Sequence, residues 1–66
     1  MNHAELSKLI NGPRGPEEVI PGLSGDELVA LLDALYRNLD TAVPDLGAAF
    51  WYELCVEESA RRAADR

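Results

Sequence analysis

The chain has 66 residues, enough for one small domain, and 47% of them are hydrophobic, a fraction ordinary for a folded globular protein. Twelve acidic side chains against six basic ones give a net charge of −6, which repels nucleic acid and anionic membrane surfaces. Direct nucleic-acid binding is therefore not expected. Membrane association is not expected either, because no apolar run approaches the ~20 residues that a membrane-spanning helix needs.

Two features of the chain bear on its location. Residues 1–10 lack the basic start and the long apolar core of a signal peptide. The chain also has a single cysteine, Cys55, whereas small secreted domains are usually rich in disulfides. Both observations favour a location inside the cell, in the cytoplasm.

A domain of this size is marginally stable unless disulfides, a metal ion, very regular packing or a partner chain support it. With one cysteine, no disulfide forms within the chain. His3 and Cys55, the strong nitrogen and sulfur metal ligands, lie at opposite ends of the sequence, which argues against a metal site. We therefore expect no metal and no cofactor, and we expect self-association or a protein partner to supply the missing stability.

A short helix is predicted over residues 2–11. Asn2 and Glu5 have the spacing of a capping box, and Gly12 followed by Pro13 is a typical helix stop. Residues 12–23 then predict a long irregular connection, in which Pro16 and the two glutamates after it favour a single helical turn. This connection contains three apolar residues that either pin it to the core or dock on a partner: Val19, Ile20 and Leu23.

The segment 24–40 is the clearest helix in the sequence. Ser24 and Glu27 have capping-box spacing at its start. Leucines recur at intervals of four, three and four, which places them on one side of the helix: Leu28, Leu32, Leu35 and Leu39. On the flanks, Leu31 widens this stripe on one side, and Val29 and Tyr36 widen it on the other. Such a face must be covered by other parts of the structure.

The last helix is predicted over residues 44–64, because Pro44 suits the first helical position. Between Leu46 and Val56 it is apolar nearly all round, which is typical of a helix covered on more than one side. One predicted face is made mostly of small residues: Ala48, Ala49, Tyr52, Cys55, Val56, Ser59 and Ala63. Another face could be covered by the first helix and residues 19–23 or by another chain, and we expect another chain; the residues of this face are Leu46, Phe50, Trp51 and Leu54. Arg61 and Arg62 are expected on the solvated final turns.

These elements predict an all-α single domain over residues 1–66. A short N-terminal helix precedes an antiparallel αα-hairpin, and the hairpin completes a helical bundle by self-association or with a partner. Because Trp51 is placed away from the small-residue face, we expect Trp51→Ala to disrupt association and to leave helicity largely intact.

No residues form a recognisable catalytic set. His3 has no carboxylate or thiol partner at ligand spacing, and glutamates surround Cys55, which opposes a reactive thiolate. The carboxylates of segment 24–40 have the positions of capping and solubility residues, and no phosphate-binding loop is present. We therefore expect that the protein is not an enzyme.

Three functional hypotheses follow from these features. The first is a small acidic interaction module, such as an inhibitor, adaptor or regulatory subunit, that presents Phe50, Trp51 and Leu54 to a larger protein. The second is a self-associating assembly protein such as a phage virion component, since the excess of arginine over lysine is typical of GC-rich bacterial and phage genomes. The third is an acidic mimic of nucleic acid that blocks a nucleic-acid-binding protein.

Overall fold

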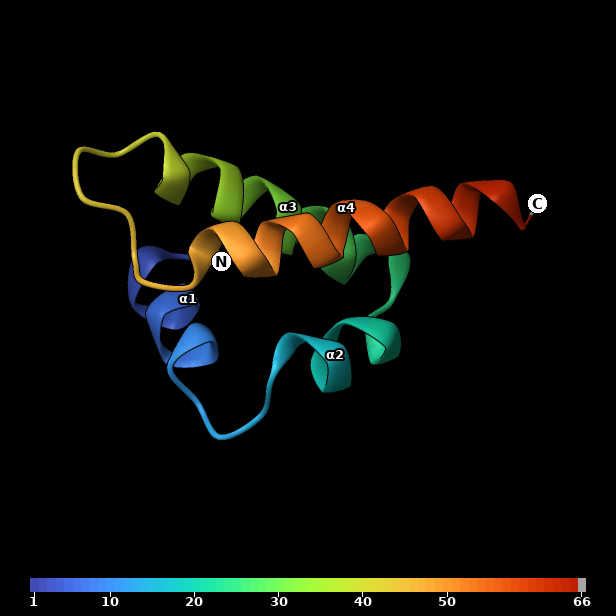
Figure 1. The fold of residues 1–66 in the computed structure, drawn as a ribbon, viewed down its shortest axis with the longest axis horizontal. Helices are drawn as coiled ribbons and strands as arrows, with labels where there is room; N and C mark the ends of the chain where they lie inside the picture. Colours follow the sequence, from blue (N-terminus) through green and yellow to red (C-terminus); the bar gives the residue numbers. More distant parts are fainter. Residues whose placement is uncertain (66) are drawn as a thin grey trace.

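The computed structural model describes residues 1–65, which form four α-helices and one short 3-10 helix (Figure 1). In chain order these are α1 (His3–Ile10), α2 (Pro16–Val19), the 3-10 helix η1 (Ile20–Gly22), α3 (Gly25–Leu39) and α4 (Ala48–Ala64). The described residues contain no strand, which confirms the all-α prediction. Arg66, the last residue of the predicted domain, lies outside the described residues.

The two long helices form the centre of the fold. α4 returns along α3, and α1 and the α2–η1 segment lie along one side of this pair (Figure 1). Pro16 of α2 is buried, and the hydrophobic core gathers side chains from the other four helical segments: Leu6, Ile20, Leu28, Leu31, Ala34, Leu35, Ala48, Trp51 and Cys55.

Both predicted capping boxes are present at the starts of α1 and α3. The Glu5 amide donates to Asn2 Oδ1 over 2.8 Å, and the Glu27 amide donates to Ser24 Oγ over 3.1 Å. In return, the Ser24 amide donates to Glu27 Oε1 over 2.8 Å. This backbone donor, followed by the Ser24 side chain, lowers the pKa of the Glu27 carboxyl.

The start of α4 differs from the prediction. α4 begins at Ala48 rather than at Pro44, because Asp45 is held by neighbouring elements. Its amide donates to Asn38 Oδ1 over 2.8 Å, and its Oδ2 accepts from Ser7 Oγ over 2.7 Å and from Asn38 Nδ2 over 3.1 Å. Gly47 then takes a positive φ of 93°, which glycine adopts without strain, and α4 begins immediately after it.

The structure buries Trp51, which was predicted to lie at an exposed interface. Its side chain is 3% exposed. Ala48, Trp51 and Cys55 follow one another at intervals of three and four residues, so they form one stripe along α4. This stripe combines Ala48 and Cys55, both from the predicted small-residue face, with Trp51, and it belongs to the hydrophobic core with α3. Trp51 is therefore a core residue.

Residues 12–23 are more ordered than predicted, since α2 and η1 occupy 16–22. Ile20 is buried, and Val19 and Leu23 are half-buried against the core. Of the two interpretations of these apolar residues, the structure agrees with the one in which they pin the segment to the core. They do not form an exposed docking loop.

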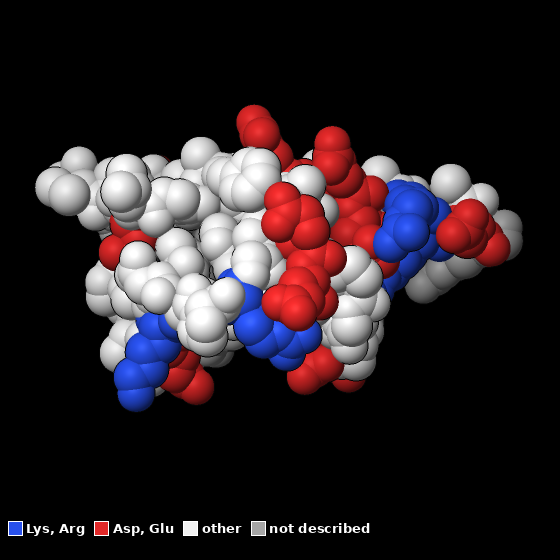
Figure 2. Space-filling model, turned by 60° about the horizontal axis from the view of Figure 1, so that its bottom comes forward, with Lys and Arg blue, Asp and Glu red and all other residues white. Residues whose placement is uncertain are grey.

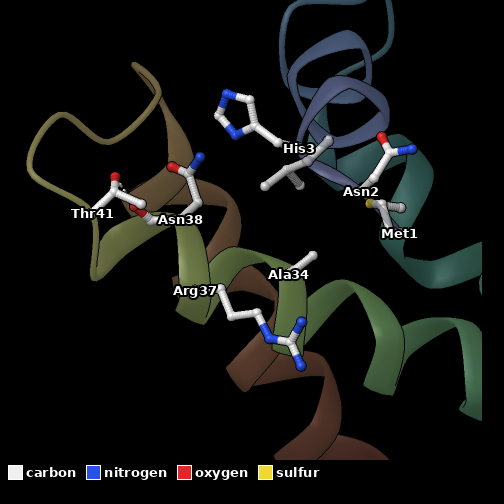
Figure 3. Close-up of a pocket in the computed structure, with 8 residues that line it drawn as sticks. Met1, Asn2, His3, Ala34, Arg37, Asn38 and Thr41 are labelled. Carbon is white, nitrogen blue, oxygen red and sulfur yellow. Dashed lines mark hydrogen bonds between the residues drawn. The ribbon is translucent and has the colours of Figure 1, made fainter.

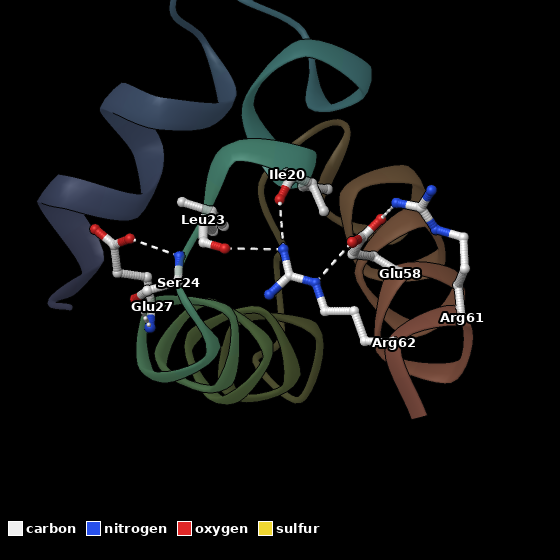
Figure 4. A network of polar contacts seen from close by, with 7 residues as sticks. All are labelled: Ile20, Leu23, Ser24, Glu27, Glu58, Arg61 and Arg62. Atoms are coloured by element: carbon white, nitrogen blue, oxygen red, sulfur yellow. Dashed lines mark hydrogen bonds and ion pairs between the residues drawn. The ribbon is translucent and has the colours of Figure 1, made fainter. Parts of the chain in front are cut away.

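Arg62 joins the end of α4 to this segment (Figure 4). Its Nη2 donates to the Leu23 carbonyl over 2.8 Å and to the Ile20 carbonyl over 3.5 Å, while its Nε donates to Glu58 Oε2 over 2.7 Å. Glu58 is buried and also pairs with Arg61. Arg62 is therefore half-buried in a polar network and not on a solvated turn as predicted.

These arginines hold the Glu58 carboxyl in its charged form. Hydrogen bonds from Arg62 and then from Arg61 lower the pKa of Glu58 below its ordinary value of 4.5. The stabilisation that this carboxylate contributes is thus present above that ordinary value. It is lost as the pH falls through the lower pKa of the folded state.

The burial of Trp51 predicts a large effect of truncation. We expect Trp51→Ala to lower the free energy of unfolding by about 3–5 kcal/mol, the usual cost of removing a buried tryptophan side chain. Phe50→Ala is the matched control, because Phe50 is the adjacent aromatic residue and is 49% exposed. Its expected cost is about 1 kcal/mol. Urea unfolding followed by circular dichroism measures both, and equal costs would place Trp51 outside the core.

The Glu58 network predicts a pH-dependent effect. At neutral pH, Glu58→Gln is expected to lower the urea midpoint, because the replacement removes the charge that Arg62 and Arg61 stabilise. As the pH falls through the lowered pKa of the Glu58 carboxyl, the two proteins are expected to converge, since the wild-type side chain then becomes neutral as well. Glu53→Gln, at an exposed position of α4, is the control and should leave the midpoint unchanged at neutral and at acidic pH. A deficit for Glu58→Gln that is the same size at neutral and at acidic pH would contradict the network's ionic character.

Candidate interaction surface

The four residues predicted to form an interface do not share one exposed face. Leu46 and Phe50 are exposed, Leu54 is half-buried, and Trp51 is in the core. Leu54 lines a hollow of about 220 Å³ with Ile20 and Pro21, so η1 covers part of its surface. The predicted interface is therefore divided by the packing of α4 against η1.

An apolar groove lies elsewhere, between α3 and α4. It encloses about 610 Å³ and is open to solvent. We call it the α3–α4 groove, and its lining residues are Val29, Leu32, Asp33, Tyr36, Tyr52, Val56, Ser59, Ala60 and Ala63. Several of these are apolar yet largely exposed: Val29 by 66%, Tyr36 by 64% and Val56 by 45%.

The two sides of the groove have the periodicity of helix faces. On α3, Val29, Leu32 and Tyr36 follow one another at intervals of three and four residues. On α4, Tyr52 and Val56 are four residues apart, and smaller side chains follow them toward the end of the helix. A second hollow, lined by Tyr36, Leu39, Asp40 and Tyr52, continues the surface at the end where the two tyrosines lie.

One side of this groove agrees with the sequence prediction, and the other side does not. Val29 and Tyr36 were recognised as a flank of the central helix. Tyr52 and Val56, however, were assigned to the same small-residue face of α4 as Ala48 and Cys55. Because Trp51 joins Ala48 and Cys55 at the inward position, α4 is rotated about its axis relative to the prediction, and Val56 is exposed. Glu58 and Arg62 continue the inward row of Trp51 and Cys55, and because charged residues are not expected at inward positions, the sequence did not indicate this row.

Carboxylates border the groove on both sides. Asp33 and Asp40 lie beside it on the α3 side, and Glu53 and Glu57 line a hollow with Tyr52 and Val56. Asp33 pairs with Arg37 over 3.1 Å, but both side chains are largely exposed, so solvent screens this pair. Among the ion pairs of residues 1–65, none involves Asp40, Glu53 or Glu57. The border is therefore acidic.

Another face of the molecule, turned toward the viewer in Figure 2, has a mixed charge. Acidic side chains gather across its middle, and the basic side chains form separate groups beside them. Within that view the described residues show no continuous basic patch of the kind that follows a nucleic-acid backbone.

A smaller pocket of about 240 Å³ lies between the start of α1 and the last turns of α3 (Figure 3). Three of its polar side chains are committed to bonds within the fold. Asn2 caps α1, Asn38 is bound to Asp45, and Arg37 pairs with Asp33. These groups therefore stabilise the fold and do not converge on a ligand.

Cys55 has the properties of a core residue rather than a nucleophile. Its side chain is fully buried, and burial raises the pKa of its thiol to about 11. The thiol is therefore neutral at physiological pH, whereas nucleophilic attack requires the thiolate. Within residues 1–65, no group of three or more His, Cys, Asp and Glu side chains is placed to hold a metal ion.

None of the helices described in residues 1–65 has the length and apolar character needed to cross a membrane. No protein-family model, no curated protein and no solved structure matches this chain. Its function is therefore inferred from its own residues.

The burial of Cys55 predicts slow thiol modification. In the folded protein at about pH 8, reaction with a disulfide reagent is expected to be at least about 100-fold slower than in urea, because the thiol is both covered and neutral. As a control, Ala60→Cys in a Cys55→Ser background places a thiol on the exposed groove. That thiol should react rapidly in the folded state, and equally rapid reaction of native Cys55 would show that the core opens readily.

Proposed function

We propose that this chain is a non-enzymatic protein-interaction module that binds a larger protein through the α3–α4 groove. The observation that carries the proposal is the exposure of Val29, Tyr36 and Val56 in a single hollow. The core lies on the other side of α3 and α4 and is filled by Leu6, Ile20 and the inward row of α4. The exposed apolar side chains are therefore left for another molecule to cover.

The composition of the groove supports this role. Tyrosine is enriched at protein interfaces, because its ring offers a large apolar area while its hydroxyl group remains satisfied by solvent or a partner. Covering the exposed part of each large side chain contributes on the order of 1 kcal/mol. The contributions of Tyr36, Tyr52 and Val56 would add to those of the other lining residues in a complex.

The polar groups withdrawn from solvent support a role without catalysis. Glu58 is bound by two arginines, Asp45 accepts hydrogen bonds from Ser7 and Asn38, and the thiol of Cys55 is neutral. Each of these groups has a structural partner or a structural environment. Glu58 also lines the hollow beside Ile20 and Pro21, but its arginine partners lower its pKa, whereas the pKa of an acid–base catalyst is tuned toward the working pH.

Site-specific photo-crosslinking tests the proposal. A photoreactive phenylalanine analogue replaces Tyr36 in one variant and Phe50 in another, in cells that make the protein. Phe50 is the matched control, because it is aromatic and comparably exposed but does not line the groove. We expect a discrete heterologous adduct from position 36 and none from position 50.

A double variant tests whether the crosslinked protein binds through the groove. Val29→Ser combined with Val56→Ser removes apolar groups from exposed positions, so the fold should persist, as circular dichroism will show. Once the crosslinked protein is identified and purified, this double variant is expected to bind it about tenfold more weakly than the wild type. Equal adducts from positions 36 and 50, or no adduct from either, would overturn the proposal.

A further inference from the structure

The charges that border the α3–α4 groove indicate what kind of partner it receives. We infer that the occupant is an amphipathic helix of a partner protein, whose apolar stripe is bordered by lysine or arginine. This inference rests on the proposed function, since it assumes that the groove is the docking surface. It specifies the chemistry of the partner.

The shape of the groove fits a third helix. Its lining on α4 extends from Tyr52 to Ala63, which corresponds to about 16 Å, or three helical turns, at 1.5 Å per residue. A helix lying between two others presents side chains at i, i+3 or i+4, and i+7 to such a groove. Ser59, Ala60 and Ala63 leave room for close approach at one end, and Tyr36 and Tyr52 provide larger contacts at the other.

The border of the groove fits a basic helix. Asp33 and Asp40 lie on one side, and Glu53 and Glu57 on the other. A helix in the groove would place the residues that flank its apolar stripe beside these carboxylates. Lysine and arginine suit such positions, because their aliphatic stems pack on apolar surface while their charged ends reach the carboxylates.

The same charges oppose a second copy of this chain as the occupant. A two-fold dimer through the groove brings the same surface of each protomer together, so Glu53 and Glu57 of one chain approach the acidic border of the other. Each chain also carries a net charge of −6. Like charges at close range destabilise such a dimer. The same negative charges also repel anionic lipids and nucleic acid.

Three synthetic helical peptides of about 18 residues test this inference. The first has a leucine stripe bordered by lysines, the second has the same stripe bordered by glutamates, and the third has the composition of the first with its leucines scrambled. Fluorescence anisotropy measures their binding to the wild-type protein. We expect the first to bind at least about tenfold more tightly than either of the others.

Two matched charge variants distinguish the effect of the groove's border on peptide binding from the effect of the protein's net charge. Glu53→Gln with Glu57→Gln neutralises the border on α4, and Glu17→Gln with Glu18→Gln neutralises two exposed carboxylates on α2. Both pairs change the net charge by the same amount. The first pair is expected to weaken binding of the lysine peptide about tenfold, and the second less than about twofold. Unfolding midpoints verify that each pair leaves the fold intact.

The outcomes distinguish this inference from the proposed function. Equal binding of the lysine and glutamate peptides, or equal losses from the two charge variants, would overturn the basic-helix inference. The groove-specific adduct from position 36 would still uphold the proposed function in that case. A stable dimer in sedimentation that Val29→Ser with Val56→Ser abolishes would overturn the inference in favour of a second copy. Absence of the adduct from position 36 would contradict the proposed function itself.

Discussion

One row of side chains on α4 determines how the rest of the chain packs. Ala48, Trp51 and Cys55 form its apolar part, and Glu58 and Arg62 continue the row at the same helical spacing. The apolar part lies in the core with the leucines of α3. The polar groups of this row have hydrogen-bond partners, because Arg62 binds Glu58 and two backbone carbonyls. Among residues 1–65, no buried side-chain nitrogen or oxygen is left without a hydrogen-bond partner. A charged pair can therefore occupy an inward position at little cost.

This arrangement explains how so short a chain encloses a core with a single cysteine. The Ile20 side chain enters the core from η1. Arg62 binds the backbone carbonyls of Ile20 and Leu23, at the start of η1 and just after its end. At the opposite end, Asp45 connects the joint before α4 to α1 and α3 through Ser7 and Asn38. Two polar networks thus close the two ends of an apolar centre. Each network joins segments far apart in the sequence. Because the core already fixes these segments, the hydrogen bonds of each network form with little further loss of backbone entropy.

The same packing leaves one side of the molecule uncovered. α1 and the α2–η1 segment lie along one side of the pair formed by α3 and α4, and both are too short to cover the other. Val29, Tyr36 and Val56 consequently remain exposed in the α3–α4 groove, bordered by carboxylates. In the proposed complex, the apolar lining would supply affinity and the acidic border would supply selectivity. This combination is the physical basis of both proposals.

Local signals in the sequence determined where most helices form. The capping boxes at Asn2 and Ser24, the stop after Ile10 and the leucine periodicity of α3 depend only on neighbouring residues, and the structure agrees with them to within about two residues. The rotation of α4 about its axis, and with it the burial of Trp51 and the exposure of Val56, was decided by tertiary structure. Along an apolar helix several faces are equally suited to burial. The choice among them depends on distant partners, such as the carbonyls that Arg62 meets, which no local pattern contains.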